Sequence, residues 1–282
     1  MNLRKVSETY LVDAVDQAGQ PVLSRTQMFE KCRDIRLDSI VSGDIVVTGN
    51  NMIWNVSTGK IIRKLGRSAH ISMQGSLVAY IDRSDLVVGL FILDTNANTA
   101  VLIPIERAPN VSAIHIYNGV LAVGYFCGDI RMYDIQTKEQ KYHTEFGEGH
   151  AVNHICMRDN LVAVSMYNGN VCVIDWKQSE TVLRGNMLFS GSLTMSREFL
   201  VGGGNDDHIY VWSLRSGKLL LDQKHHTRPK HIFMNDDRTL VVFSYSILTV
   251  YQCWPTAESV FALSRKWQWD GDGAMRSRMF TT

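Results

Sequence analysis

The sequence predicts an all-β fold built from repeated four-stranded units, and three observations predict it. A short motif recurs at nearly constant spacing along the 282 residues, and apolar runs of strand length alternate with turn-forming residues. No long window shows the 3.6-residue periodicity of an amphipathic helix, which disfavours helical repeats of similar length. The composition, 45% hydrophobic and 20% charged, is that of a globular protein.

Each copy of the motif is an apolar run that ends in a large apolar residue and a polar residue, followed by a turn and a second short strand. The polar positions are Asp16, Asn55, Asp94, Asp134, Asp175, Ser213 and Gln252. They are spaced by 39, 39, 40, 41, 38 and 39 residues. Such even spacing predicts seven copies of a unit of about 40 residues.

A second marker runs in step with the first. His70, His154 and His231 each open an apolar segment that precedes another apolar run, and His115 opens a shorter copy. Turn-forming pairs such as Asn118-Gly119 separate these runs, so each unit holds about four short strands. Because the histidines recur at equivalent positions, we expect them to have a structural role.

The repeats resemble those of the WD-repeat family, in which each unit is a four-stranded blade of a β-propeller. Trp54-Asn55 and Trp212-Ser213 are similar to the Trp-Asp dipeptide of that family, and Gly149-His150 is similar to its blade-opening Gly-His pair. The resemblance covers nearly the whole chain and implies a single propeller domain over residues 1–282. Asn168 replaces the usual Asp of the inner turn, so we expect the family's hydrogen-bonded tetrad to be missing from most blades.

Ring closure is expected because an open array of blades would expose strand edges. In the family that the chain resembles, the two chain ends share one blade. Residues 10–26 could supply two outer strands of such a blade, and residues 266–280 read as a hairpin that could supply the inner two. This predicts seven blades, with the closing blade shared by the N- and C-termini. Six blades with loose ends are the alternative.

The motifs of common enzymes are missing from the sequence. It contains no GxxxxGK[ST], GxSxG or HExxH motif, and the glycine-rich run Gly202–Gly204 precedes a strand-like segment instead of a helix. The acidic segment at Asp270 has Thr281 where a calcium loop needs its closing carboxylate. His225-His226 and His231 have no Cys or carboxylate at ligand spacing. We therefore expect no enzyme, no cofactor and no metal.

Charge and cysteine usage limit the environment and the partners. The formal net charge of +1 gives no bulk attraction to nucleic acid or anionic lipid. No run of about 18 apolar residues and no secretory signal are present, so we expect no membrane association. The five cysteines form no CxxC pair, which favours a reducing intracellular compartment, cytoplasmic or nuclear.

Candidate partner-binding residues lie in two kinds of connection that share one face of a propeller. The turns between second and third strands carry Tyr125, Phe126, Tyr167 and Tyr245. A connection between blades carries Arg228 and Lys230. Aromatic and basic side chains together suit an acidic or phosphorylated peptide. The alternatives are aromatic strand ends packed against a neighbouring blade and a solvated basic loop.

The function expected from this resemblance is a non-catalytic scaffold that binds partner proteins or peptides on one face. A narrower alternative is the substrate-recognition subunit of a ubiquitin ligase, because the repeats resemble those of F-box/WD-repeat proteins, although no F-box-like helical stretch precedes Tyr10. Two further classes are disfavoured. An enzyme site in a central channel lacks a converging set of catalytic residues, and RNA binding would depend on the basic rim alone.

Overall fold

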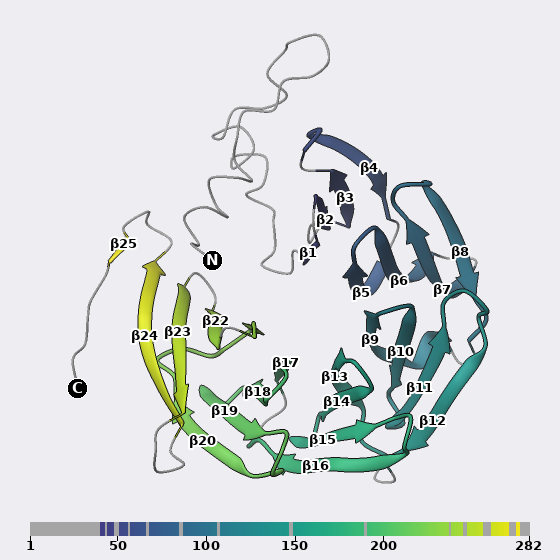
Figure 1. Cartoon of the computed structure of the whole chain (residues 1–282). Coiled ribbons are helices and arrows are strands. Elements are labelled where there is room, and N and C mark those ends of the chain that lie inside the picture. The colour runs from purple at the N-terminus through teal and green to yellow at the C-terminus, as the bar shows by residue number, and fades with distance from the viewer. Residues whose placement is uncertain are drawn as a thin grey trace. The chain divides into compact units, whose positions relative to one another are not determined.

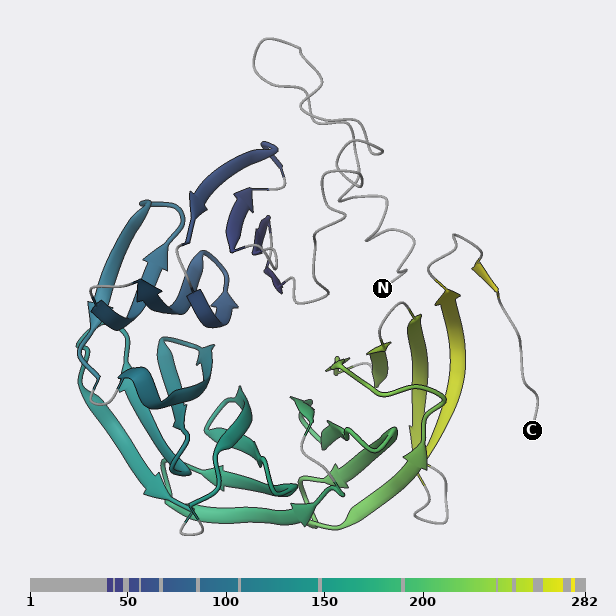
Figure 2. The same cartoon turned by 180° about the vertical axis from the view of Figure 1, so that it is seen from behind.

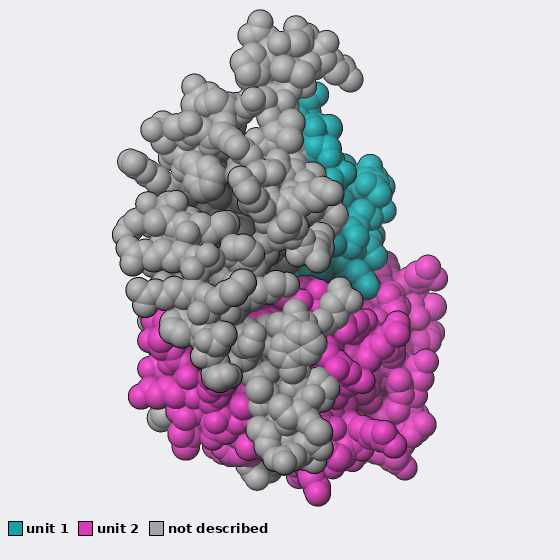
Figure 3. Space-filling view, turned by 60° about the vertical axis from the view of Figure 1, so that its left-hand side comes forward, with its two compact units in different colours: residues 1–109 teal, residues 110–282 magenta. Residues whose placement is uncertain are grey.

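In the structure, a computed structural model, the regular secondary structure of the described residues is β-strand apart from one 3-10 turn. The structure describes residues 40–42, 44–47, 51–55, 57–65, 68–84, 87–105, 108–146, 149–188, 191–236, 238–244, 247–255, 261–270 and 275–276. These residues form six antiparallel sheets, which makes the fold an all-β β-propeller (Figures 1 and 2). No helix among them is long and apolar enough to cross a membrane. Chain contacts divide the molecule into two compact units, residues 1–109 and 110–282 (Figure 3), and the single domain stays a prediction.

The first unit contains two four-stranded sheets with simple up-and-down order. Their strands are β1 (Ile40–Ser42), β2 (Ile45–Val47), β3 (Met52–Asn55) and β4 (Lys60–Lys64), then β5 (Ser68–Gln74), β6 (Leu77–Ser84), β7 (Val87–Asp94) and β8 (Thr99–Ile103). Alternate residues of the first sheet, such as Val47 and Ile53, pack against Val78 and Leu93 of the second. The core of this unit therefore lies between the two sheets, as expected for stacked blades.

The second unit contains four sheets, and the 3-10 turn η2 (Ala108–Asn110) lies where the chain passes from the first unit to the second. The third sheet has β9 (Val111–Tyr117), β10 (Val120–Tyr125), β11 (Asp129–Asp134) and β12 (Gln140–Glu145). The fourth has β13 (Val152–Arg158), β14 (Leu161–Met166), β15 (Asn170–Asp175) and β16 (Glu180–Asn186). The fifth has β17 (Ser192–Met195), β18 (Phe199–Gly203), β19 (His208–Ser213) and β20 (Leu219–Lys224). The sixth has β21 (His231–Met234), β22 (Thr239–Ser244), β23 (Ile247–Pro255), β24 (Phe261–Asp270) and β25 (Met275–Arg276).

The strands of each sheet are called a to d here, in chain order. In the second unit the a strands of consecutive sheets are neighbours, and the cores lie between sheets. Trp212 of the fifth sheet is 2% exposed and packs in the cluster shared with the fourth sheet. Because each sheet buries one face against the next, burial continues from β9 to β23 without a separate centre.

The recurrent polar residue of the sequence motif has a local structural cause. Asn55, Asp94, Asp134, Asp175 and Ser213 are the last residues of the c strands β3, β7, β11, β15 and β19. The side-chain oxygen of Asp175 accepts hydrogen bonds from the amides of Lys177 and Gln178, at 3.0 and 3.1 Å. The other four accept equivalent bonds. Each therefore closes the c–d turn as an Asx- or Ser-type cap.

Residues that contact each other between neighbouring sheets are about one repeat length apart in the sequence. The amide of Leu193 donates to Nδ1 of His154, 39 residues earlier, and the amide of Met234 donates to Oγ1 of Thr194, 40 residues earlier. Both amides lie on a strands, whose inner edges have no further strand to pair with. Side chains of the preceding sheet therefore satisfy the edge of the next one.

Three expectations about the repeat were wrong. The described residues form six blades, not seven, and the C-terminal segment supplies no inner strands: β24, which contains Trp267 and Trp269, is the d strand of the sixth sheet. The physical reason is local, because a ten-residue strand next in the chain can cover the exposed edge of β23. The predicted N-terminal strands in residues 10–26 lie outside the described residues. His115 occupies the register of Cys156 and not that of His154.

Candidate partner-binding surface

In the second unit the b–c turns and the d–a connections form one continuous series of contacts. The amide of Tyr167, in a b–c turn, donates to the carbonyl of Ala151 in the connection that enters its sheet. The carbonyl of Gly169, in the same turn, accepts from the amide of Met187 in the connection that leaves. Each b–c turn is thus held between two connections. This set of loops is called the b–c face below.

Neighbouring sheets extend the series in both directions. Gly128 of the preceding turn lies so close to His150 that a Cβ placed on it would be 2.9 Å from the carbonyl oxygen of His150. In the following sheet, Nε of Arg228 donates to Oδ1 of Asn205 at 2.7 Å. The b–c turns of the third, fourth and fifth sheets and the connection that enters the sixth sheet therefore make one surface.

The structure places two of the predicted aromatic residues on this surface with accessible side chains. Phe126 is 48% exposed and Tyr167 is 60% exposed. Leu188, in the connection next to Gly169, is 68% exposed, and the sequence analysis did not single it out. Its only sequence signal is an apolar residue just after the end of β16, which reads equally well as strand. An exposed apolar group of this kind is typical of interaction sites.

Tyr125 does not belong to the accessible surface. Its side chain is 1% exposed, and the guanidinium of Arg131 lies 5.5 Å from its ring centroid. Tyr125 is the last residue of β10, and consecutive residues of a strand point to opposite sides, so Phe126 faces outward where Tyr125 faces inward. This residue matches the alternative of an aromatic strand end packed within the fold. Tyr245 lies outside the described residues.

The two predicted basic residues are both exposed. Arg228 is oriented by its bond to Asn205, and the backbone of Lys230 is fixed by a bond from its amide to the carbonyl of Phe243. The nearby side chain of Asp206 is partly buried, and its Oδ2 accepts a hydrogen bond of 2.5 Å from the hydroxyl group of Tyr210. The cationic groups at this end of the b–c face therefore point outward while the neighbouring carboxylate is engaged.

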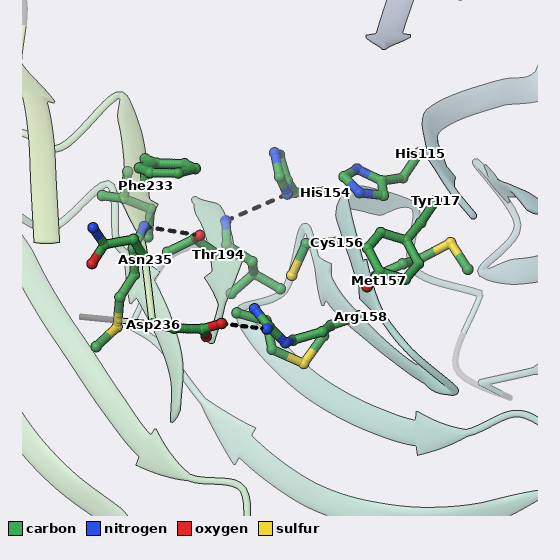
Figure 4. Close-up of a pocket in the computed structure, with 14 residues that line it drawn as sticks. His115, Tyr117, His154, Cys156, Met157, Arg158, Thr194, Phe233, Asn235 and Asp236 are labelled. Atoms are coloured by element: carbon green, nitrogen blue, oxygen red, sulfur yellow. Dashed lines mark hydrogen bonds and ion pairs between the residues drawn. The ribbon is translucent and has the colours of Figure 1, made fainter. Parts of the chain in front are cut away.

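A pocket of about 480 Å³ lies along the a strands of the second unit (Figure 4). It is lined by residues of β9, β13, β17 and β21 and of the turn after β21, including His115, His154, Cys156, Phe233 and Asp236. Several of its polar groups have partners within the fold: His154 and Thr194 accept the amide hydrogen bonds described above, and Arg158 forms an ion pair with Asp236 at 2.6 Å.

Burial sets the ionisation of the pocket. It lowers the pKa of His115 and of His154 to about 4, so both imidazoles are neutral at pH 7. Burial also raises the pKa of the Cys156 thiol to about 12, so it is not a thiolate at that pH. Cys156 is therefore not in the thiolate form in which cysteine acts as a nucleophile.

Comparison with known proteins shows which fold the chain has but assigns it to no family. No family model matches the chain, and no curated protein matches it. Among solved structures, the computationally designed Ika8 protein has a TM-score of 0.64 and 17% identity, over 84% of each chain. The WD40 repeats of RRP9 have a TM-score of 0.65 and 13% identity, over 78% of this chain and 75% of that one. A chain of the mitotic checkpoint complex has a TM-score of 0.60 and 17% identity, over 73% and 70%. The chain therefore has a β-propeller fold similar to that of WD40 repeat proteins.

Proposed function

We propose that this chain is a non-catalytic protein-interaction module of the WD-repeat type, which binds a partner protein or peptide on the b–c face. The observation that carries the proposal is that Phe126, Tyr167 and Leu188 are exposed on adjoining loops. Backbone hydrogen bonds hold the Tyr167 turn to the connections on either side of it, and the turn that carries Phe126 packs against His150 in one of those connections. A rigid surface loses little conformational entropy on binding, so exposed aromatic side chains on it are suited to anchor a partner.

The chemistry of the partner follows from the basic end of the same face. Arg228 and Lys230 are exposed there, while Asp206 is engaged by Tyr210. A segment with an apolar residue followed by acidic or phosphorylated residues would place its apolar group near Tyr167 and its negative charge near Arg228. The raised pKa of Cys156 supports a role without catalysis, because the thiol of this pocket is not a thiolate at pH 7.

The cellular setting is also proposed. Cys127, Cys156 and Cys172 are free thiols in the structure, which fits a reducing compartment such as the cytoplasm or the nucleus. The narrower role as a substrate-recognition subunit of a ubiquitin ligase stays a prediction, and the partners recovered below would decide it.

Affinity capture with quantitative mass spectrometry tests the proposal. Four baits are compared: wild type, the double variant Phe126→Ala/Tyr167→Ala, the single variant Arg228→Glu, and the double variant Lys218→Glu/Leu219→Ala. The last is the matched control. Lys218 and Leu219 are also an exposed basic and an exposed apolar residue, but they lie at a c–d turn, at the other end of the strands.

We expect partners that wild type and the control retain and that the b–c variants lose. Partners retained equally by all four baits would contradict the choice of face. Partners removed by nuclease, with affinity that falls steeply with salt, would favour RNA binding instead.

A further inference from the structure

Three potential metal ligands meet on one side of the third sheet, at the end of the strands next to the b–c face. Asp129 of β11 and Glu145 of β12 are paired directly across the two strands, and His143 lies two residues before Glu145. Nε2 of His143 is 3.8 Å from Oδ2 of Asp129 and 3.8 Å from Oε1 of Glu145. One donor atom from each residue lies within 4.8 Å of the other two.

The Asp129 carboxylate has no compensating donor among the residues that the structure describes. The side chain of Asp129 is 12% exposed, and Nε2 of His143 lies 3.8 Å from Oδ2 of Asp129, beyond hydrogen-bond distance. A largely buried carboxylate without a hydrogen bond is unfavourable, and a second carboxylate directly across the strands adds repulsion. A cation between the three donors would remove both penalties.

In the neighbouring sheets, the side chains at the equivalent positions form hydrogen bonds or ion pairs with each other. In the fourth sheet the two positions are Asn170 and Asn186, which form a neutral hydrogen bond of 3.0 Å. In the fifth sheet His208 takes the position of Asp129 and is paired with Asp222 at 2.5 Å. Among these three sheets, only the third sets two carboxylates opposite each other.

We propose that Asp129, His143 and Glu145 form a binding site for a divalent transition-metal cation such as Zn²⁺. A triangle of donors with these separations has a point no more than about 2.5 Å from all three atoms, so shifts of a few tenths of an ångström reach the usual Zn–N and Zn–O distances. One imidazole with two carboxylates favours zinc over magnesium, which prefers oxygen ligands and retained water. Arg131 lies on the same side of β11 and is the competing cation, held over the Tyr125 ring.

The site does not depend on the proposed function, although the two lie close together. Asp129 directly follows the turn that carries Phe126, and Glu145 is the last residue of β12. A bound cation would hold the end of β12 to the end of that turn. Spacing along the sequence does not reveal the site, because its residues are separated by 14 and 2 positions on two strands and only the strand register brings them together.

Isothermal titration of the full chain with ZnCl₂, with MgCl₂ in a parallel titration, tests this site. We expect one zinc ion per chain and much weaker magnesium binding. His143→Gln and Glu145→Gln should each weaken zinc binding by at least about tenfold, because both remove a ligand. His208→Gln is the matched control, since it removes the histidine of the other histidine–carboxylate pair at this register.

The same proteins are compared by thermal unfolding, in which zinc should raise the Tm of wild type and of the control but not of His143→Gln. Circular dichroism identifies any variant that fails to fold, and the other site variant then carries the comparison. Zinc affinity that is unchanged in both site variants, or reduced equally by His208→Gln, would overturn the proposal.

Discussion

Nη2 of Arg158 lies 2.6 Å from Oδ2 of Asp236, 78 residues further along the chain. Arg158 ends β13 in the fourth sheet and Asp236 lies in the turn after β21 in the sixth, so the pair spans the fifth sheet. The amide of Arg197, in the fifth sheet, also donates to Asp236, at 3.2 Å. One carboxylate therefore connects three consecutive sheets of the second unit at their a–b turns.

The first prediction concerns this contact. Although partial burial acts to raise it, the pKa of Asp236 is lowered overall by the bonds from Arg158 and Arg197. A lowered pKa means that this contribution to stability is present above the ordinary Asp value and is lost as the pH falls through the folded-state pKa. A double-mutant cycle with Arg158→Ala and Asp236→Ala should give a coupling of about 0.5–1 kcal/mol in urea unfolding at pH 7. Zero coupling at low salt would contradict the contact.

The second prediction concerns the cap at the end of β15. Asp175 is 7% exposed and accepts two turn amides as well as the side-chain amide of Asn160. Asp175→Ala leaves these donors without their acceptor and should lower the free energy of unfolding by about 1–3 kcal/mol. Asp175→Asn keeps one acceptor oxygen and should lower it less. Equal losses in the two variants would show that the turn does not depend on the accepted hydrogen bonds.

The capping residues show how far the sequence could predict the fold. Asp134 and Asp175 recur because each acts within its own turn, so their spacing revealed the repeat without knowledge of any distant contact. The partner of β23 could not be predicted in this way. An edge strand accepts any suitable segment, and residues 266–270, which were predicted to belong to a seventh blade, are part of β24 beside β23 in the sixth sheet.

The surface residues were predicted less well than the repeat, for two reasons. Exposure depends on which side of a strand a residue faces, and paired residues can lie far apart along the chain. Tyr125 and Phe126 are adjacent, and a shift of one residue in the strand end decides which is buried. Arg158 and Asp236 are paired across two sheets at positions that do not recur in the motif. Exposure and cross-sheet pairing depend on register in three dimensions, which spacing along the chain does not encode.

The third prediction concerns acid sensitivity. The pKa values of His115 and His154 are lowered from 6.5 to about 4 by burial, and Nδ1 of His154 accepts the amide of Leu193 in its neutral form. Between those pH values the unfolded chain binds protons that the folded chain does not, so stability falls as the pH falls from about 6.5 toward 4. Urea midpoints at pH 7 and pH 5 should therefore differ in wild type.

His154→Asn provides the comparison for this effect. Its side-chain oxygen can accept the Leu193 amide and does not titrate, so the loss of stability between pH 7 and pH 5 should be smaller than in wild type. His150→Asn, which replaces an exposed histidine in the connection before β13, serves as the control and should keep the wild-type loss. The same loss in His154→Asn and wild type would show that protonation of His154 does not set the acid limit.

The last prediction separates backbone conformation from space at two glycines of hairpin turns. Gly119 has φ +76° with nothing within 4 Å of an added Cβ, whereas Gly169 has φ +90° and an added Cβ would overlap the carbonyl oxygen of Met187. Gly119→Ala should therefore cost only the left-handed backbone penalty, about 1–2 kcal/mol. Gly169→Ala must also push the Met187 connection away and should cost more than about 3 kcal/mol, measured by urea unfolding.

Because that connection carries Leu188 and the turn carries Tyr167, partner capture should fall in Gly169→Ala at temperatures where the protein is still folded, and Gly119→Ala should capture as wild type does. Equal stability losses in the two variants would mean that the b–c turn and the connection are not in the contact that builds the b–c face.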